Sequence, residues 1–132
     1  MTCPDAETLP SCSSQSDIDA AFTTWLSGFT FSGGVNVEEF GLVGAEAPDS
    51  CGGSITVDYR VEGDCASGSC SSTFTVTGPT DITVTCPQAA TLPSCSSQSD
   101  IDAAFASWIG TFSFTGGCDV TATDISLSLI HI

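Results

Sequence analysis

The residues of this chain with the most chemical potential are its eight cysteines, which stand among 132 residues with a single Met and a single His. Such cysteine usage is typical of disulfide frameworks formed in an oxidising compartment. Structural zinc sites usually need close pairs such as C-x2-C, whereas the closest pair here is Cys65 and Cys70. We therefore expect disulfide bonds rather than metal-bound thiolates, and an extracellular location.

Nucleophilic catalysis has no support in the sequence. A serine or cysteine nucleophile needs a nearby base, and His131, the single histidine, stands at the extreme end. Two carboxylate pairs recur, Asp17 with Asp19 and Asp100 with Asp102. Residues two apart on a helix point roughly 200° from each other, so these pairs suit helix capping better than acid and base work. We expect no enzymatic activity.

Calcium is the more serious metal hypothesis. Acidic side chains stand in expected loops and at the junction, foremost Asp64, Asp81 and Asp119, the last together with Asp124. The sequence contains no EF-hand loop and no nine-residue Gly/Asp repeat, so a solvated acidic surface is the simpler interpretation. The sequence predicts no cofactor, with calcium as the alternative.

Charge narrows the choice of partners. Lys and Arg together number one, Arg60, against 16 Asp and Glu, and the formal net charge is -15. Nucleic acids and anionic membranes require basic surfaces, so we expect neither as a partner, and no segment has the length of a membrane-spanning helix. With 41% hydrophobic residues, the chain has enough apolar side chains for a packed core.

An internal repeat sets the domain organisation. At an offset of 83, residues 3–34 align with residues 86–117 and are identical at 23 of 32 positions. This period is too long for solenoid repeats of roughly 20 to 50 residues and fits an array of whole domains. We expect one complete module at residues 1–82 and the truncated N-terminal part of a second at 83–132.

The two ends of the chain suggest a fragment. Residues 1–4 have neither a basic start nor an apolar run, so an exported protein would carry its signal peptide elsewhere. Residues 127–132 break the repeat and match the translated end sequence of a transposase adapter used to prepare sequencing libraries. We expect residues 127–132 to be a non-native tail.

The sequence predicts one helix near the start of each module. Ser16 to Asp19 has the form of a capping box, and an apolar stripe follows it, so the pattern predicts a helix from about Asp17 to Leu26 that ends at Gly28. The stripe consists of Ile18, Phe22, Trp25, Leu26 and Phe29, repeated as Ile101, Phe105, Trp108, Ile109 and Phe112. In the truncated second module this apolar face would be exposed.

The rest of the module has strand character. Residues 54–62 alternate strictly, with Ile55, Val57, Tyr59 and Val61 on one face, and residues 72–76 continue the pattern. Further short strands are expected at 29–31 and 35–43. One buried and one wet face predict a mainly β fold, an antiparallel sandwich with one short inserted helix per module.

The segments TCP at 2–4, CGGSITVDY at 51–59 and CSSTFTVTGP at 70–79 resemble HYR (hyalin-repeat) modules, which are immunoglobulin-like sandwiches. The segment LPSCSSQSDIDAAFTTWL at 9–26 resembles the HYR-like subtype found in long arrays in giant surface proteins of gliding, Bacteroidetes-type bacteria. The resemblance covers residues 1–125.

This resemblance implies a non-catalytic structural and adhesive repeat that acts as a spacer in an extracellular cell-surface array. Its partners would be neighbouring modules of the same chain, with surface glycans or proteins as further candidates. The alternatives are a specific glycan- or protein-binding module and an accessory domain of a secreted enzyme.

The resemblance also implies a disulfide set. Cys3 would pair with Cys70, a bridge worth about 4 kcal/mol in the chain-entropy model. Cys12 would pair with Cys65, and a rearranged bond between Cys51 and Cys65 is the alternative.

The third pair implied by the resemblance would join Cys51 to position 35, where Val35 stands in module one and Cys118 at the aligned place in module two. Cys51 is therefore expected to be free. In module two the partners of Cys86, Cys95 and Cys118 would fall beyond residue 132, so these three are expected to be unpaired.

Overall fold

The computed structural model describes residues 1–122. The predicted tail at 127–132, Asp124 and His131 lie outside the described residues. The chain divides into two compact units, the first from Met1 to Pro79 and the second beginning at Thr80. The division comes slightly before the expected boundary at residue 82, because Thr80 belongs to the second unit, where its carbonyl accepts a 2.9 Å hydrogen bond from the Gly117 N–H.

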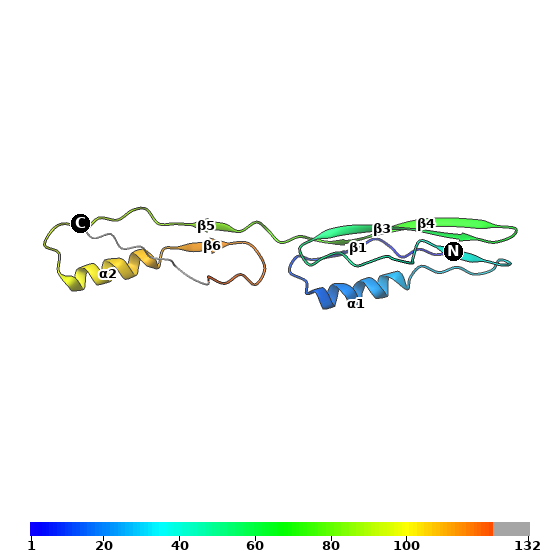
Figure 1. Cartoon of the computed structure of the whole chain (residues 1–132), viewed down its shortest axis with the longest axis horizontal. Helices are drawn as coiled ribbons and strands as arrows, with labels where there is room; N and C mark the ends of the chain where they lie inside the picture. Colours follow the sequence, from blue (N-terminus) through cyan, green and yellow to red (C-terminus); the bar gives the residue numbers. More distant parts are fainter. Residues whose placement is uncertain (123–132) are drawn as a thin grey trace. The chain divides into compact units, whose positions relative to one another are not determined.

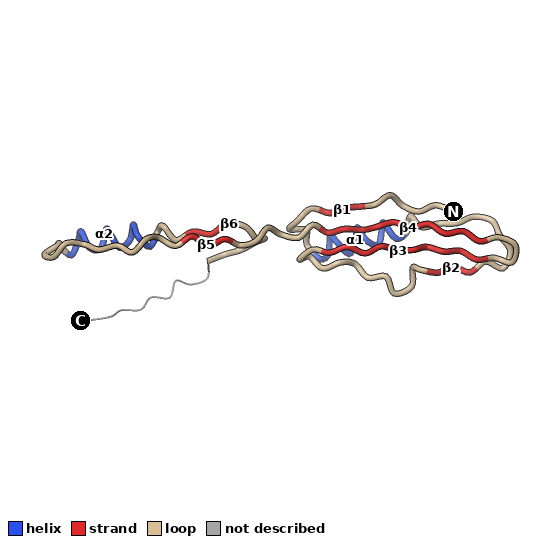
Figure 2. The backbone as a smooth tube through the Cα atoms, turned by 90° about the horizontal axis from the view of Figure 1, so that it is seen from above, coloured by secondary structure: helices blue, strands red, loops and turns tan. Residues whose placement is uncertain are grey.

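Unit 1 contains a four-stranded sheet in the order β1-β4-β3-β2 (Figure 2). Its centre is a long hairpin of β3 (Gly53–Glu62) and β4 (Ser67–Val76), antiparallel from Gly53 opposite Val76 to Glu62 opposite Ser67. The short β2 (Glu38–Phe40) adds an antiparallel edge to β3, and β1 (Glu7–Leu9) adds a parallel edge to β4.

One helix, α1 (Gln15–Leu26), covers one face of this sheet (Figure 1). Its N-cap is Ser14, whose Oγ accepts a 3.2 Å hydrogen bond from the Asp17 N–H. The predicted N-cap at Ser16 was wrong by two residues. Ser14 stands three residues before Asp17, which is the same spacing as that of the predicted capping box. After the helix, Gly28 approaches Pro4 so closely that an added Cβ would stand 2.8 Å from the proline Cβ.

The core of unit 1 lies between α1 and the β3–β4 hairpin. Phe74 of β4 is fully buried, with its ring 5.3 Å from Phe22 and 5.5 Å from Trp25 of the helix. Phe29 packs edge-on against Tyr59 at 5.5 Å. The remaining buried apolar side chains are Ile18, Val57, Val61 and Val76. The predicted alternation in both long strands and the helical stripe are confirmed by this burial.

The structure confirms a mainly β fold with a helix in each unit, but not a sandwich. The predicted strand at 29–31 forms only an isolated bridge between Thr30 and Thr2, and the predicted strand at 35–43 is reduced to β2. Residues 1–79 contain a single named sheet, and the aromatic side chains of α1 occupy the side on which a second sheet was expected.

Unit 2 repeats the start of unit 1. It contains β5 (Thr83–Thr85), α2 (Gln98–Ile109) and β6 (Ser113–Thr115), with β5 and β6 antiparallel. The Trp108 indole N–H donates to the Gln88 carbonyl at 2.8 Å, as the Trp25 indole donates to the Asp5 carbonyl at 3.0 Å. The sequence repeat is therefore also a structural repeat. Residues 80–122 contain no counterparts of β3 and β4.

Candidate functional site

One disulfide closes unit 1. Cys3 and Cys70 are bonded, with their Cα atoms 6.2 Å apart and a sequence separation of 67. Both side chains are half-buried and pack against the core cluster. The pair implied by the HYR resemblance is thus formed, and it ties the N-terminal segment to the middle of β4.

The second implied pair, Cys12 with Cys65, is not formed. Cys65 is an exposed free thiol in the turn between β3 and β4, whereas Cys12 is disulfide-bonded. Cys12 follows β1, which pairs with β4 at its Val76 end, and Cys65 precedes the Ser67 end. A ten-residue strand is about 30 Å long at roughly 3.3 Å per residue, so Cys12 and Cys65 stand at opposite ends of the ladder.

The remaining cysteines differ in state. Cys51, Cys86 and Cys95 are exposed free thiols. Cys118 was expected to be unpaired, but it is half-buried and disulfide-bonded. That expectation considered only partners at the spacing of module one, and this spacing does not limit which thiol a loop cysteine can reach.

The thiol of Cys51 lies beside a carboxylate. Asp49 Oδ1 accepts a 2.8 Å hydrogen bond from the Cys51 backbone N–H, and this bond lowers the pKa of Asp49. A hydrogen bond between the thiol and the Asp49 carboxylate, reinforced by the negative charge, raises the pKa of Cys51. The loop is fixed to the start of α1, because Gln15 Oε1 accepts from the Ser50 N–H at 3.0 Å. A thiol kept protonated is a poor nucleophile, so this site favours an inert Cys51.

The structure does not gather the calcium candidates. Asp64 lies in the β3–β4 turn, where its Oδ2 accepts a 2.6 Å hydrogen bond from Asn36 Nδ2. Asp81 and Asp119 lie in unit 2, the first with its carbonyl against Gly116 and the second in a left-handed backbone conformation with φ of 50°. Within residues 1–122, no three His, Cys, Asp or Glu side chains are placed to hold a metal ion.

The recurring carboxylate pairs act at the helix starts. Asp19 Oδ1 accepts a 2.9 Å hydrogen bond from Gln15 Nε2, and Asp102 Oδ1 accepts one of 2.8 Å from Gln98 Nε2. Asp17 stands in the first turn of α1, where a negative charge is favoured by the helix dipole. Asp100 has the same place in α2. These contacts provide a structural account of all four carboxylates without a substrate.

A polar contact joins β2 to β3. The phenol of Tyr59 donates a 3.0 Å hydrogen bond to Glu39 Oε2, and burial followed by this contact with Glu39 raises the pKa of Tyr59. On the same strands, the Arg60 guanidinium lies 4.9 Å from the centre of the Phe40 ring and 3.2 Å from Glu62. The contacts of Glu39 with Tyr59 and of Phe40 with Arg60 join the edge strand β2 to β3.

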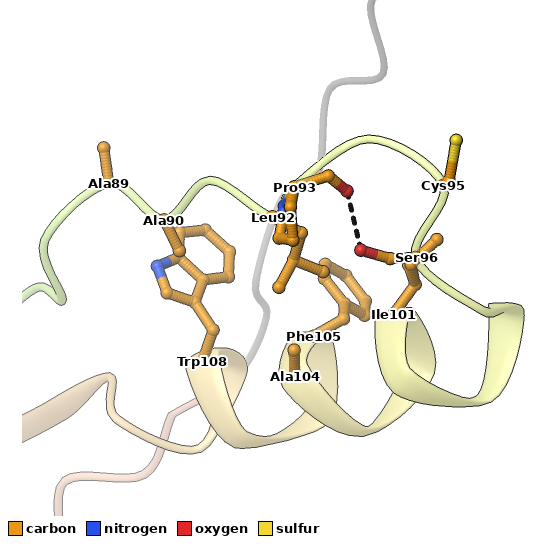
Figure 3. A pocket seen from close by; sticks show the side chains of 10 residues that line it. All are labelled: Ala89, Ala90, Leu92, Pro93, Cys95, Ser96, Ile101, Ala104, Phe105 and Trp108. Atoms are coloured by element: carbon orange, nitrogen blue, oxygen red, sulfur yellow. Dashed lines mark hydrogen bonds between the residues drawn. The ribbon is translucent and has the colours of Figure 1, made fainter.

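An uncovered apolar groove lies on unit 2 (Figure 3). Its volume is about 600 Å³, and one wall is α2 while the other is the segment 89–96. Phe105 is 48% exposed there, whereas its counterpart Phe22 in unit 1 is 4% exposed. The sequence predicted the exposed helix face. It did not predict the facing wall, although the matching order of Ala, Leu and Pro residues in both modules was a usable signal.

No helix in the described part of the chain is both long enough and apolar enough to cross a membrane. Comparison of the chain with protein-family models, with curated proteins and with solved structures finds no match in any of the three.

Proposed function

We propose that the chain is part of a tandem array of HYR-like modules on the outside of a cell, in which each module serves as a non-catalytic structural and adhesive spacer. The observation that carries this proposal is the recurrence of one folded start in both units. The same helix cap and the same indole hydrogen bond stand 83 residues apart.

The immunoglobulin-like character belongs to the same proposal. The long antiparallel hairpin with one buried face is compatible with a HYR-like sheet, and α1 would take the place of a second sheet. The oxidised Cys3–Cys70 bond supports an extracellular location, since such bonds persist in oxidising compartments.

The position of this bond suits a module under tension. Tension along the array would enter near Cys3 and leave after β4, at Thr77 to Pro79. The bond carries it directly from Cys3 to Cys70, so the segment enclosed by the bridge is bypassed. Because β1 and β3 flank β4 from both sides, the strand that bears the tension is held by two rows of backbone hydrogen bonds.

Single-molecule pulling tests the proposal. The full chain would be held at its N-terminus and at a non-cysteine handle introduced at Thr80. With the bond intact, unit 1 should release only the short stretch after Cys70. Reduction or a Cys3→Ser change should lengthen the release by about 220 Å, since extended chain spans roughly 3.3 Å per residue over the enclosed loop, whose ends are 67 residues apart. Equal release in both states would contradict the proposal.

The genomic neighbourhood provides the second test, and it separates the spacer from the other interpretations. A run of further copies in the parent gene supports an array, since each copy repeats the same supporting contacts. A neighbouring catalytic domain would instead identify the chain as an accessory domain of a secreted enzyme.

A further inference from the structure

The groove on unit 2 corresponds to a helix face that the β3–β4 hairpin covers in unit 1. In unit 1, Phe22 and Trp25 stack at 5.7 Å and the hairpin covers them. In unit 2, the counterparts Phe105 and Trp108 stack at 6.2 Å in the same way, without that cover. The aromatic surface therefore adopts its packed geometry before any hairpin is present.

The backbone of residues 90–92, beside the groove, is not paired as the equivalent strand of unit 1 is. In unit 1, β1 is a strand because Glu7, Thr8 and Leu9 pair in parallel with Phe74, Thr75 and Val76 of β4. The equivalent residues 90–92 of unit 2 form no strand, and Leu92 is 44% exposed. An edge of this kind can accept an added strand through its main-chain groups.

A third feature marks the same place. Cys86 is the counterpart of Cys3, which in unit 1 bonds to Cys70 of β4. Cys86 is an exposed free thiol. Within residues 80–122, no segment takes the place of β4 at the helix face, the strand edge or the thiol.

We propose that α2 and residues 90–92 form a docking site for a β-hairpin of the β3–β4 type, whose β4 strand pairs in parallel with residues 90–92. The equivalent of Phe74 would pack against both Phe105 and Trp108, as Phe74 packs against Phe22 and Trp25, and the equivalent of Cys70 would lie beside Cys86. This inference rests on the proposed function, because it takes the two units as copies of one module.

Disulfide trapping tests the site. A synthetic peptide of residues 53–77 carrying Cys65→Ser retains Cys70 as its single thiol. It would be incubated with the full chain in a buffer of reduced and oxidised glutathione. One disulfide forms between Cys70 of the peptide and a thiol of the chain, while one oxidised glutathione is reduced to two thiols. Peptide mapping should locate the bond at Cys86 rather than at Cys51, Cys65 or Cys95.

Paired variants make the trapping specific. A Phe74→Ser peptide, and separately a Phe105→Ser chain, should lower the yield at Cys86 by at least about fivefold, because central aromatic anchors dominate interface energies. A chain with Val43→Ser is the matched control, since Val43 is 99% exposed on unit 1, and it should trap like the parent. Because the peptide variant leaves the chain untouched, a folding defect in Phe105→Ser cannot explain both losses.

Three outcomes would overturn the inference. These are equal trapping at every free thiol, insensitivity to the Phe74→Ser change, and self-association of the chain through α2, detected by light scattering and abolished by Phe105→Ser. The last would identify a second copy as the occupant. Pulling experiments on unit 1 do not involve this groove, so failure here leaves the proposed function standing on its own test.

Discussion

Asp49 and Cys51 illustrate how a single carboxylate sets the reactivity of a neighbouring thiol. The Asp49 carboxylate accepts a hydrogen bond from the thiol and its negative charge disfavours a second one beside it, so the pKa of Cys51 is raised. The thiolate is the reactive form, and its fraction at any pH below the pKa falls as the pKa rises. The exposed thiol of Cys51 is thereby made less reactive in disulfide exchange.

We expect Asp49→Asn to accelerate alkylation of Cys51 by iodoacetamide. The amide oxygen can still accept the hydrogen bond from the Cys51 N–H, but the charged carboxylate, which raises the thiol pKa through its hydrogen bond to the thiol and through its negative charge, is gone. The pH profile of the Cys51 rate should move to lower pH, so the rate at mildly alkaline pH should increase. Peptide-resolved mass spectrometry measures this rate, and alkylation of Cys65 in the same sample is the control. An unmoved profile would show that the carboxylate does not set the reactivity.

Elements with local periodic signals were predictable from this sequence. The alternation of residues 54–62 and the stripe from Ile18 to Phe29 place β3 and α1 within a few residues of their observed bounds. The same chemistry explains the misplaced cap, since Ser14 and Ser16 both stand three residues before an aspartate. Sequence spacing alone cannot decide between two such frames.

Elements that depend on distant partners could not be predicted. The strand β1 has no alternating pattern of its own and exists because β4 lies beside it. Its counterpart at 90–92 demonstrates this, because a nearly identical segment without a β4 forms no strand. The implied Cys12–Cys65 pair was wrong for the same reason, since the β-ladder that separates these two residues is a non-local structure.

The turn between β3 and β4 carries the next prediction. The Asp64 N–H donates to the Val35 carbonyl at 3.1 Å, and Gly63 lies against the same carbonyl. Position 35 therefore lies beside Cys65, and not beside Cys51 as the resemblance implied. A cysteine introduced at position 35 would therefore lie close to the thiol of the turn.

We expect Val35→Cys to form a disulfide with Cys65 when oxidised by glutathione disulfide. Mapping under non-reducing conditions should recover the linked peptides, and the bond should raise the free energy of unfolding by up to about 3.7 kcal/mol, as the loop-entropy model gives for a loop of about 30 residues. Val35→Ser is the matched control, because Val35 is 62% exposed and its loss alone costs little. Recovery of a bond between the introduced thiol and Cys51 instead would restore the original assignment.

At the scale of the whole molecule, the two units bury very different amounts of apolar surface. Within residues 1–122, every residue of the buried apolar core belongs to unit 1, and α2 has no buried side chain. The net charge of -15, with a single arginine, destabilises the folded state through repulsion between the acidic side chains. Stability against unfolding must therefore come from the α1 core and the bond that closes it.

Removal of that bond should destabilise unit 1 alone. We expect the double variant Cys3→Ser with Cys70→Ser to lower its free energy of unfolding by about 4 kcal/mol, because the bond constrains a long loop of the unfolded chain. Urea unfolding followed by tryptophan fluorescence measures the loss, since Trp25 is buried in the folded unit. Cys65→Ser, which removes an exposed free thiol, should change stability by less than about 0.5 kcal/mol. If both variants unfold at the same urea concentration as the parent, helix and hairpin packing alone holds the unit, and the bond's role is confined to resisting tension.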